Sequence, residues 1–446
     1  MKFPVVHLGG EKCVTGSCHF MQLQGLNILV DCGMTQGEDR GVDPSQWPVR
    51  ASELDFIFLT HAHVDHIGML PRLIADGFGG EIICTHPTQA LIVPMLNDAM
   101  RFEHLSDDAR QDVTRRIDDL SWGFECGPTF DLKRGISFKL GRAGHILGSC
   151  FIRLESARDG FSILFSGDLG NRDTPLLPDP EAADPADFLI LESTYGNRLH
   201  GDRRQRVRQL AGVLAHCLAD GGKVFIPAFA LGRTQEVLYE LDRIFSDDAY
   251  REMYPQLRGE AHPPVFLDSP LGLDITQIYS GLHAYWDEEA RALLMGGEDP
   301  LDFDRLFAVP RHYQHEQLLG VDGPVIIIAG SGMCAGGRIV DHLVHGIEEP
   351  RNDIVFVGYT AKGTPGRCIQ AQAESHGTVV LDGVERRVRA GVHVLSGYSA
   401  HADQRGLLDW VGAMGGRPKM IRLVHGEDDA RSALAAALEQ RGYVVG

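Results

Sequence analysis

A group of histidines directly after an apolar run constrains this chain more than any other feature. His61, His63, Asp65 and His66 follow the apolar run 56–59. A buried strand ending there would bring all four side chains onto one turn at its carboxyl edge. His61 and His63 alternate and can share one metal ion, whereas Asp65 and His66 suit a second. Imidazole nitrogen with carboxylate oxygen is a donor set for zinc, or for manganese or iron.

The alternative interpretation is a polar loop rich in histidine, but closely spaced ligands after a buried strand favour a metal site. Two later residues strengthen this prediction. His145 lies within the segment 144–149, and Asp168 follows the apolar run 163–165, each beside glycine at the edge of a predicted strand. We expect them to complete a dinuclear centre in which Asp168 bridges the ions.

Asp31 ends a predicted hairpin formed by residues 20–23 and 27–30. A carboxylate at a strand end can hydrogen-bond a metal ligand and fix its orientation. We therefore expect Asp31 to support the histidine loop, with the cap of a turn as the alternative.

Length and composition indicate a multidomain globular protein. A chain of 446 residues is too long for a single core, and 43% hydrophobic with 23% charged residues is ordinary globular composition. No apolar run reaches the roughly 18 residues of a membrane span, and the start lacks the core of a signal peptide. Nine cysteines without paired spacing predict reduced thiols and a cytoplasmic protein without membrane contact.

The net charge of −19 argues against a basic coat that binds nucleic acid regardless of sequence. A polyanion would have to be held locally, by metal and by a few arginines or lysines.

The middle of the chain alternates apolar strands with amphipathic helices, which predicts a parallel α/β domain. A helix over 203–219 opens this region. The predicted strands are 223–227, 265–267, 325–329 and 354–358, and the predicted helices are 233–245, 274–286 and 338–345.

Two glycine-rich loops of this domain, 330–338 and 362–367, offer backbone N–H groups beside cationic side chains, as phosphate sites do. A purely structural turn is the alternative for each. Residues 330–335 also fit a dinucleotide fingerprint, but no acidic residue follows the next strand, which disfavours nicotinamide binding. The candidate substrate-binding residues are Ser331, Arg338, Lys362, Thr364 and Arg367.

The segments 191–196, 399–403 and 422–427 again place Glu or His after apolar strands. Together with Asp31, the histidine motif, His145 and Asp168, they resemble the signature of the β-CASP nucleases of the metallo-β-lactamase fold. The resemblance covers essentially the whole chain and is strongest to the RNA-processing branch. No amino-terminal RNA-binding extension and no long carboxyl-terminal domain is seen.

This resemblance implies an α/β fold: an αββα metallo-β-lactamase sandwich with an inserted parallel α/β domain. The expected boundaries are 1–202 and 389–446 for the sandwich, and 203–388 for the insertion. The resemblance assigns His61, His63 and His145 to one zinc ion. It assigns Asp65, His66 and Asp168 to the other, with His425 as an added ligand; manganese is the alternative metal.

The expected chemistry is hydrolysis of RNA phosphodiester bonds, because two divalent ions activate water and polarise a phosphoryl group. Asp65 can steer the proton of the attacking hydroxide. The departing oxygen needs a proton, which a histidine held by a carboxylate can supply. Glu192 with His401 fits this demand, and the family gives these positions that role. His425 favours RNA over DNA, because the DNA-acting branch typically carries valine there.

Two other function classes stay open. A small-molecule hydrolase acting on thioesters or lactams is disfavoured, because such a reaction has no function for the insertion of about 180 residues. A catalytically dead scaffold would lack ligands, and none is missing. The expected partner is single-stranded RNA; the sequence leaves open a homo-oligomer, its RNA context, and endonuclease against exonuclease action.

Overall fold

The computed structural model describes residues 3–37, 39–102, 106–201, 205–257, 262–358 and 360–446. The chain divides into two compact units. Residues 1–199 and 401–446 form the sandwich unit, and residues 200–400 form the inserted unit.

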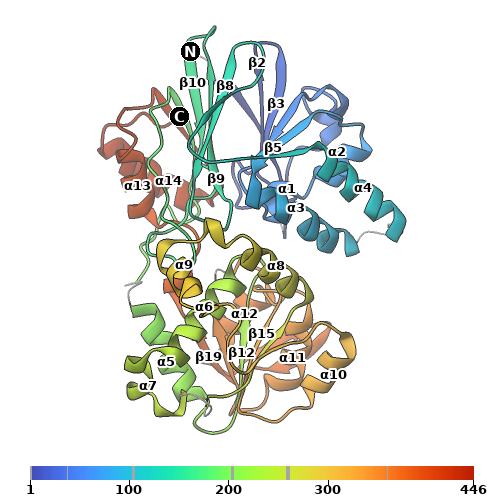
Figure 1. Cartoon of the computed structure of the whole chain (residues 1–446), viewed down its shortest axis with the longest axis vertical. Helices are drawn as coiled ribbons and strands as arrows, with labels where there is room; N and C mark the ends of the chain where they lie inside the picture. The colour runs from blue at the N-terminus through green and yellow to red at the C-terminus, as the bar shows by residue number, and fades with distance from the viewer. Residues whose placement is uncertain (1–2, 38, 103–105, 202–204, 258–261, 359) are drawn as a thin grey trace. The chain divides into compact units, whose positions relative to one another are not determined.

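The sandwich unit contains two six-stranded sheets (Figure 1). In each sheet, antiparallel strands lead into parallel ones: β1, β2 and β3 are antiparallel, whereas β3 to β6 are parallel. The first sheet has β1 (Val5–Gly9), β2 (Cys18–Leu23), β3 (Leu26–Cys32), β4 (Phe56–Phe58), β5 (Glu81–Thr85) and β6 (Ser121–Phe124). The second has β20 (Met420–Val424), β11 (Phe188–Glu192), β10 (Phe161–Phe165), β9 (Cys150–Ser156), β8 (Ile136–Arg142) and β7 (Thr129–Asp131), in that order.

A core between the sheets holds this unit together. Met21, Phe56 and Phe58 of the first sheet pack with Phe138 and Phe165 of the second. A second core joins the outer face of the second sheet to α13 (Gln404–Gly412) and α14 (Asp428–Gln440), and α1 (Val64–Ile67), α2 (Leu70–Ala75), α3 (His86–Ala99) and α4 (Asp107–Leu120) lie beside the first sheet (Figure 1). The predicted αββα sandwich is confirmed.

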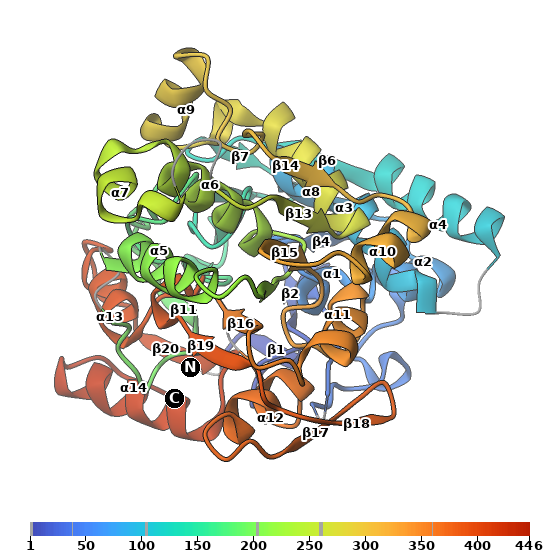
Figure 2. The same ribbon diagram turned by 90° about the horizontal axis from the view of Figure 1, so that it is seen from below.

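The inserted unit is built on a parallel sheet in the order β14-β13-β15-β12-β16-β19 (Figure 2). The sequence Val-Ile-Ile-Ile-Ala of β15 is buried at every position, as expected of a central strand covered on both faces. The strands are β12 (Lys223–Pro227), β13 (Val265–Asp268), β14 (Leu306–Ala308), β15 (Val325–Ala329), β16 (Asp353–Phe356) and β19 (Gly391–Val394), with a separate hairpin of β17 (Thr378–Leu381) and β18 (Val384–Arg387).

The α-helices of the inserted unit alternate with these strands. On one face, Ile339 and Leu343 of α11 and Ile369 of α12 pack against Phe225 and Ile327 of the sheet. The helices are α5 (Arg206–Cys217), α6 (Arg233–Ser246), α7 (Asp248–Met253), α8 (Pro270–Gly281), α9 (Glu288–Met295), α10 (His312–Leu319), α11 (Arg338–Gly346) and α12 (Pro365–Gln372).

Several predicted boundaries differ from the structure, among them three in the inserted unit. The inserted unit continues past the expected residue 388 to residue 400, because β19 pairs in parallel with β16. Helix α8 begins at Pro270 rather than 274, since the Ser269 side chain caps it by accepting from the Gly272 N–H. Helix α5 is shorter than predicted at its carboxyl end, and the predicted residues 203–204 lie outside the described part of the chain.

Among the described residues, no helix is both long and apolar enough to cross a membrane.

Candidate metal centre

The strand ends of the sandwich unit collect the predicted ligands on one edge. The histidine motif follows β4 and runs into α1, Asp168 follows β10, and His425 follows β20. His145 lies in the turn between β8 and β9, and Glu192 is the last residue of β11. Because β10, β11 and β20 are parallel neighbours, their carboxyl ends meet at the same edge.

The first donor cluster consists of His61, His63, His145 and Asp168. The His63 Nδ1 atom lies 3.1 Å from His61 Nε2 and 3.2 Å from His145 Nε2. The Asp168 Oδ2 atom lies 3.6 Å from His61 Nε2 and 3.7 Å from His145 Nε2. Four donors around a tetrahedral zinc ion, with bonds of roughly 2.0–2.1 Å, would be about 3.3 Å apart. The cluster therefore fits one zinc-sized cation.

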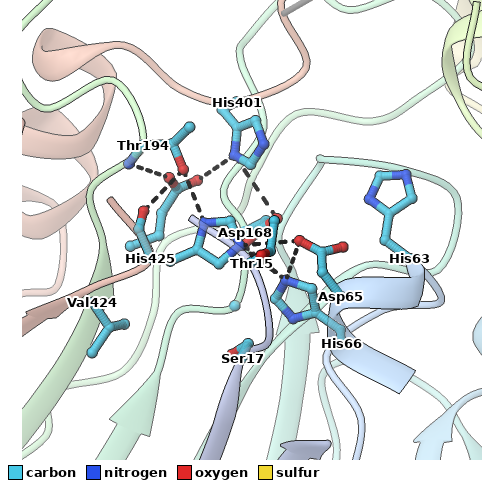
Figure 3. A network of polar contacts seen from close by, with 12 residues as sticks. Thr15, Ser17, His63, Asp65, His66, Asp168, Thr194, His401, Val424 and His425 are labelled. Carbon is cyan, nitrogen blue, oxygen red and sulfur yellow. Dashed lines mark hydrogen bonds and ion pairs between the residues drawn. The ribbon is translucent and has the colours of Figure 1, made fainter. Parts of the chain in front are cut away.

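The second donor cluster consists of Asp65, His66 and His425 (Figure 3). The His425 Nε2 atom lies 3.3 Å from His66 Nε2 and 3.4 Å from Asp65 Oδ2. Asp168 contributes its other oxygen here, because Oδ1 lies 3.4 Å from His66 Nε2 and 3.7 Å from His425 Nε2. This cluster has the donor set and spacing of a second cation site.

Asp168 thus directs one carboxylate oxygen at each cluster. It is 3% exposed, and its Oδ1 atom is buried without a hydrogen-bond partner among the described residues. A buried carboxylate oxygen left in this way is costly unless a cation approaches it. The arrangement is the one expected of a bridging ligand between two ions.

The imidazoles of the first cluster are held neutral. Burial lowers the pKa values of His61 and His145 well below the ordinary value and also lowers the pKa of His63. A neutral ring keeps a lone pair for a metal ion, so these three side chains need no deprotonation before they bind one.

The imidazoles of the second cluster are drawn toward the charged form. Burial opposes protonation of His66 and His425, but the neighbouring carboxylates, led by Asp168, outweigh it and raise both pKa values. A cation entering the second cluster must displace these protons. Cation binding there is consequently more sensitive to acid than binding to the first cluster.

Asp31 supports the histidine motif through contacts with His66 and Thr60. Its Oδ2 atom lies 2.7 Å from His66 Nδ1, and its Oδ1 atom accepts from the Thr60 N–H at 2.8 Å. With Nδ1 engaged, His66 presents Nε2 to the second cluster. Gly33 is required nearby, since a Cβ atom there would lie 1.6 Å from the Asp65 carbonyl oxygen.

Thr194 orients the imidazole of His425 through its Nδ1 atom, as Asp31 orients that of His66. Its Oγ1 atom lies 3.0 Å from His425 Nδ1 and donates to the His425 carbonyl at 3.1 Å (Figure 3). Thr194 was assigned no separate role from the sequence, although its place two residues after Glu192 could have suggested one. His425 has a φ of 53° and Asp31 a φ of 58°, uncommon left-handed conformations for such residues. Side-chain contacts at the site hold both in place.

Glu192 and His401, for which the sequence predicted a joint role as proton donor, lie in contact. The His401 Nδ1 atom lies 3.2 Å from Glu192 Oε1, which also accepts from the Leu169 N–H at 2.7 Å. The other Glu192 oxygen accepts from the Thr194 N–H at 3.1 Å. The loop carrying His401 is fixed by an antiparallel bridge to Gly170. Burial disfavours charge on His401, but Glu192 and Asp168 outweigh it and raise its pKa to about 9.

The predicted phosphate loops share the carboxyl edge of the inserted unit's sheet. The loop 330–337 follows β15, the segment 362–367 follows β16 and runs into the first turn of α12, and both strands flank β12. The Gly366 N–H donates to the Met333 carbonyl at 2.9 Å and so joins the two loops. Lys362 and Arg367 are exposed there.

The other three candidate substrate-binding residues are engaged within the unit. The guanidinium of Arg338 donates to Asp268 Oδ1 at 2.7 Å and to the Val309 carbonyl. The Thr364 side chain caps α12 by accepting from the Arg367 N–H, and Ser331 Oγ accepts from the Ala335 N–H. We therefore expect these three residues to shape the loops, and Lys362 and Arg367 to present charge.

Phe229 is a residue at this edge that the sequence did not single out. It follows β12 between the two loops, it is 38% exposed, and its ring packs against Gly332. An exposed aromatic ring at a sheet edge that also carries cationic residues is a surface on which a nucleobase can stack.

Three protein families match consecutive parts of the chain. The metallo-beta-lactamase superfamily matches residues 12–212, the Beta-Casp domain matches residues 234–369, and the Zn-dependent metallo-hydrolase RNA specificity domain matches residues 385–445. These three matches cover both units.

Relatives match over nearly the full chain. Ribonuclease TTHA0252 of Thermus thermophilus is 37% identical over 441 residues, which cover 99% of this chain and 97% of that protein. Transcription termination factor FttA of Methanocaldococcus jannaschii is 30% identical over 440 residues, covering 95% of this chain and 67% of that protein. A solved structure, a protein of unknown function from Enterococcus faecalis, aligns over 100% of this chain and 97% of its own with a TM-score of 0.56 and 11% identity. That likeness concerns the fold alone.

Proposed function

The chain belongs to the β-CASP family of the metallo-β-lactamase superfamily, and on that premise we infer that it is a metal-dependent ribonuclease. The observation that carries this inference is Asp168, which directs one oxygen at each of two donor clusters. The full-length similarity to a ribonuclease supports RNA as the substrate class.

The finer assignment is two zinc ions per chain, acting on single-stranded RNA in the cytoplasm. Zinc is supported by a donor set rich in imidazole and by donor spacings close to those of a tetrahedral ion. Manganese is the alternative metal, because Asp65 and Asp168 supply oxygen ligands. The cytoplasm is supported by nine cysteines without a disulfide framework.

Two bound cations would supply a hydroxide at neutral pH and polarise the phosphoryl group. Asp65 lies at the rim of the second cluster, with a side chain 18% exposed, where its carboxylate can accept a proton from the attacking water. The pKa of Asp65 is lowered because His66 and His425 outweigh its burial, so the carboxylate stays ionised for this role.

His401 would donate a proton to the departing oxygen. Glu192 faces Nδ1, which orients the ring and favours its charged form. The proton for the substrate would then leave from Nε2, the nitrogen on the other side of the ring. Glu192 is itself fixed by the Leu169 and Thr194 N–H groups, so the pair is arranged before substrate binds.

We assign substrate binding to the loop edge of the inserted unit. Lys362 and Arg367 would contact phosphates, while Ser331, Arg338 and Thr364 hold the loops that present them. A few placed cations of this kind reconcile polyanion binding with a net charge of −19.

The test is incubation of the purified protein with 5′-labelled single-stranded RNA, with and without a chelator. Nitrocefin and a thioester serve as parallel substrates, and readdition of zinc serves as the control for the chelator. We expect RNA cleavage that the chelator abolishes and zinc restores. Turnover of nitrocefin or the thioester with intact RNA would instead identify a small-molecule hydrolase.

A further inference from the structure

A second type of donor cluster lies in the inserted unit. It consists of Cys217, the last residue of α5, with Asp353, the first residue of β16, and His393 of β19. The Cys217 Sγ atom lies 3.6 Å from His393 Nε2, and His393 Nε2 lies 2.8 Å from Asp353 Oδ1. Three donors from three separate elements thus converge on one point, and none of them belongs to the dinuclear centre or the loop edge.

The spacing of the sulfur and nitrogen donors suits a zinc-class ion, whereas the 2.8 Å between His393 Nε2 and Asp353 Oδ1 is a hydrogen bond that the ion would replace. With bonds of roughly 2.3 Å to sulfur and 2.0–2.1 Å to nitrogen, tetrahedral zinc would place these two donors about 3.5 Å apart. Gly391 gives the carboxylate its room, because a Cβ atom there would lie 2.0 Å from Asp353 Oδ1 and 3.3 Å from His393 Nε2. Cys217 is buried, whereas the His393 side chain is 26% exposed and leaves solvent access for a fourth ligand.

The charges around these donors also favour a cation. Among the described residues, no lysine or arginine forms an ion pair with Asp353, whose partner is His393. Burial, followed by the Asp353 carboxylate, raises the pKa of Cys217. A divalent cation would offset both effects by stabilising the thiolate and the carboxylate together.

Another cluster in the same unit contains its own positively charged side chain. Asp268 Oδ2 lies 2.6 Å from both His315 Nδ1 and His342 Nε2, and its Oδ1 accepts from the Arg338 guanidinium. Those contacts are hydrogen bonds, as is the 2.8 Å contact between His393 and Asp353, but here the positive charge of Arg338 already neutralises the carboxylate. We therefore attribute the Asp268 cluster to hydrogen bonding and distinguish it from the Cys217 cluster.

We propose that Cys217, Asp353 and His393 bind one divalent cation of the zinc class, separate from the dinuclear centre. On binding, the Cys217 S–H bond breaks, its proton passes to solvent, and a sulfur–metal bond forms. The ion would fasten the carboxyl end of α5 to β16 and to the edge strand β19, and so stabilise the inserted unit. This inference does not depend on ribonuclease activity.

Cobalt tests the proposal directly, because a thiolate bound to Co²⁺ gives a near-ultraviolet charge-transfer band that nitrogen and oxygen ligands do not. Among the candidate donor clusters of the described residues, the Cys217 cluster alone contains a thiol. The full-length protein is stripped of metal and titrated with Co²⁺. We expect the band to saturate with one thiolate-bound cobalt per chain, besides the cobalt that the dinuclear centre takes up. A wild-type protein that binds cobalt without the band would overturn the proposal, whatever the catalytic centre does.

Variants locate the band. Cys217→Ser should abolish it, whereas Cys368→Ser, which removes an exposed thiol of the same unit, should leave it unchanged. His393→Gln keeps the thiol and should weaken the cobalt affinity of this site by at least about tenfold. Circular dichroism checks that each variant is folded. A band that persists in folded Cys217→Ser would contradict the assignment.

Discussion

The carboxyl edges of the two units differ in the groups they offer to a ligand. The edge of the sandwich unit is made of side chains: buried imidazoles and carboxylates, with His66 oriented by Asp31 and His425 by Thr194. The edge of the inserted unit is made of glycine-rich backbone, with the exposed cations Lys362 and Arg367. The first edge can hold metal ions and move protons, and the second can hold phosphates.

This difference implies a division of labour between catalysis and binding. Changes at the sandwich edge should lower the rate of cleavage and spare the salt dependence of RNA binding. Changes at the loop edge should reduce the salt dependence of RNA binding and have little effect on the rate of cleavage. Five single substitutions and one double variant test the division, from the largest expected effect to the smallest.

Replacement of the bridging carboxylate should have the largest effect. Asp168→Ala removes one oxygen from each cluster, so we expect both metal sites to lose occupancy. Cleavage should fall by more than about 10⁴-fold, beyond the worth of a single proton donor. Metal analysis of the purified variant checks this, with Asp184→Asn, an exposed carboxylate paired with Lys139, as the control. Loss of one metal with the other fully retained would show that Asp168 does not bridge.

Removal of the proposed acid should slow cleavage without removing metal. His401→Ala is expected to cost roughly 10²–10⁴-fold in rate, the usual contribution of a positioned proton donor. RNA affinity and its salt dependence should be unchanged, as measured by filter binding. His86→Ala, which removes a partly exposed imidazole of the same unit, is the matched control. A variant depleted of zinc would identify His401 as a ligand instead.

Neutralisation of Glu192 should have a smaller effect that depends on pH. A general acid works only while protonated, so activity should be lost as pH rises through the pKa of His401, about 9 in the metal-free structure. Cations bound next to His401 would lower its pKa below that value. Glu192→Gln removes the carboxylate that raises this pKa, so the alkaline limb of the rate profile should move to lower pH. An unmoved limb would mean that Glu192 does not set the protonation of His401.

The double variant sharpens the same point. Glu192→Gln combined with His401→Ala should be little slower than His401→Ala alone, because the two residues form one device. Additive losses in single-turnover kinetics would assign them separate roles.

Substitution at the loop edge should have the smallest effect on rate. Lys362→Ala or Arg367→Ala should weaken RNA binding and reduce the slope of log affinity against log salt by about 0.7, the contribution of one phosphate contact in a single strand. Metal content should not change. Arg351→Ala removes an exposed cation just before β16, at the opposite end of the same strand, and is the control. An unchanged slope would place the RNA elsewhere.

The sequence predicted which residues meet at the sandwich edge, because these candidate ligands carry distinctive chemistry. Closely spaced histidines after an apolar strand have few structural explanations, and Asp168, Glu192 and His425 each stand at the end of an apolar run. Parallel strands bring their carboxyl ends together. Correctly predicted strands therefore also predict which side chains share one edge of the sheet. The structure brings every predicted ligand into one of the two clusters.

The sequence predicted the loop edge less well because its features are not specific to binding. Arg338 in a glycine-rich loop fits a phosphate ligand, but its guanidinium is held by Asp268, a residue 70 positions earlier in the chain. The cluster of Cys217, Asp353 and His393 could not be predicted from the sequence. Its three residues are far apart in sequence, and only the pairing of β16 with β19 brings two of them together.

The most direct test of the account is a substrate whose leaving atom needs no proton. RNA with a sulfur in place of the departing oxygen is offered to His401→Ala and to the wild-type protein under single-turnover conditions. If His401 is the proton donor, the sulfur substrate should restore much of the lost rate to the variant and change the wild-type rate far less. If the variant cleaves the sulfur substrate no faster than ordinary RNA, His401 does not protonate the leaving group.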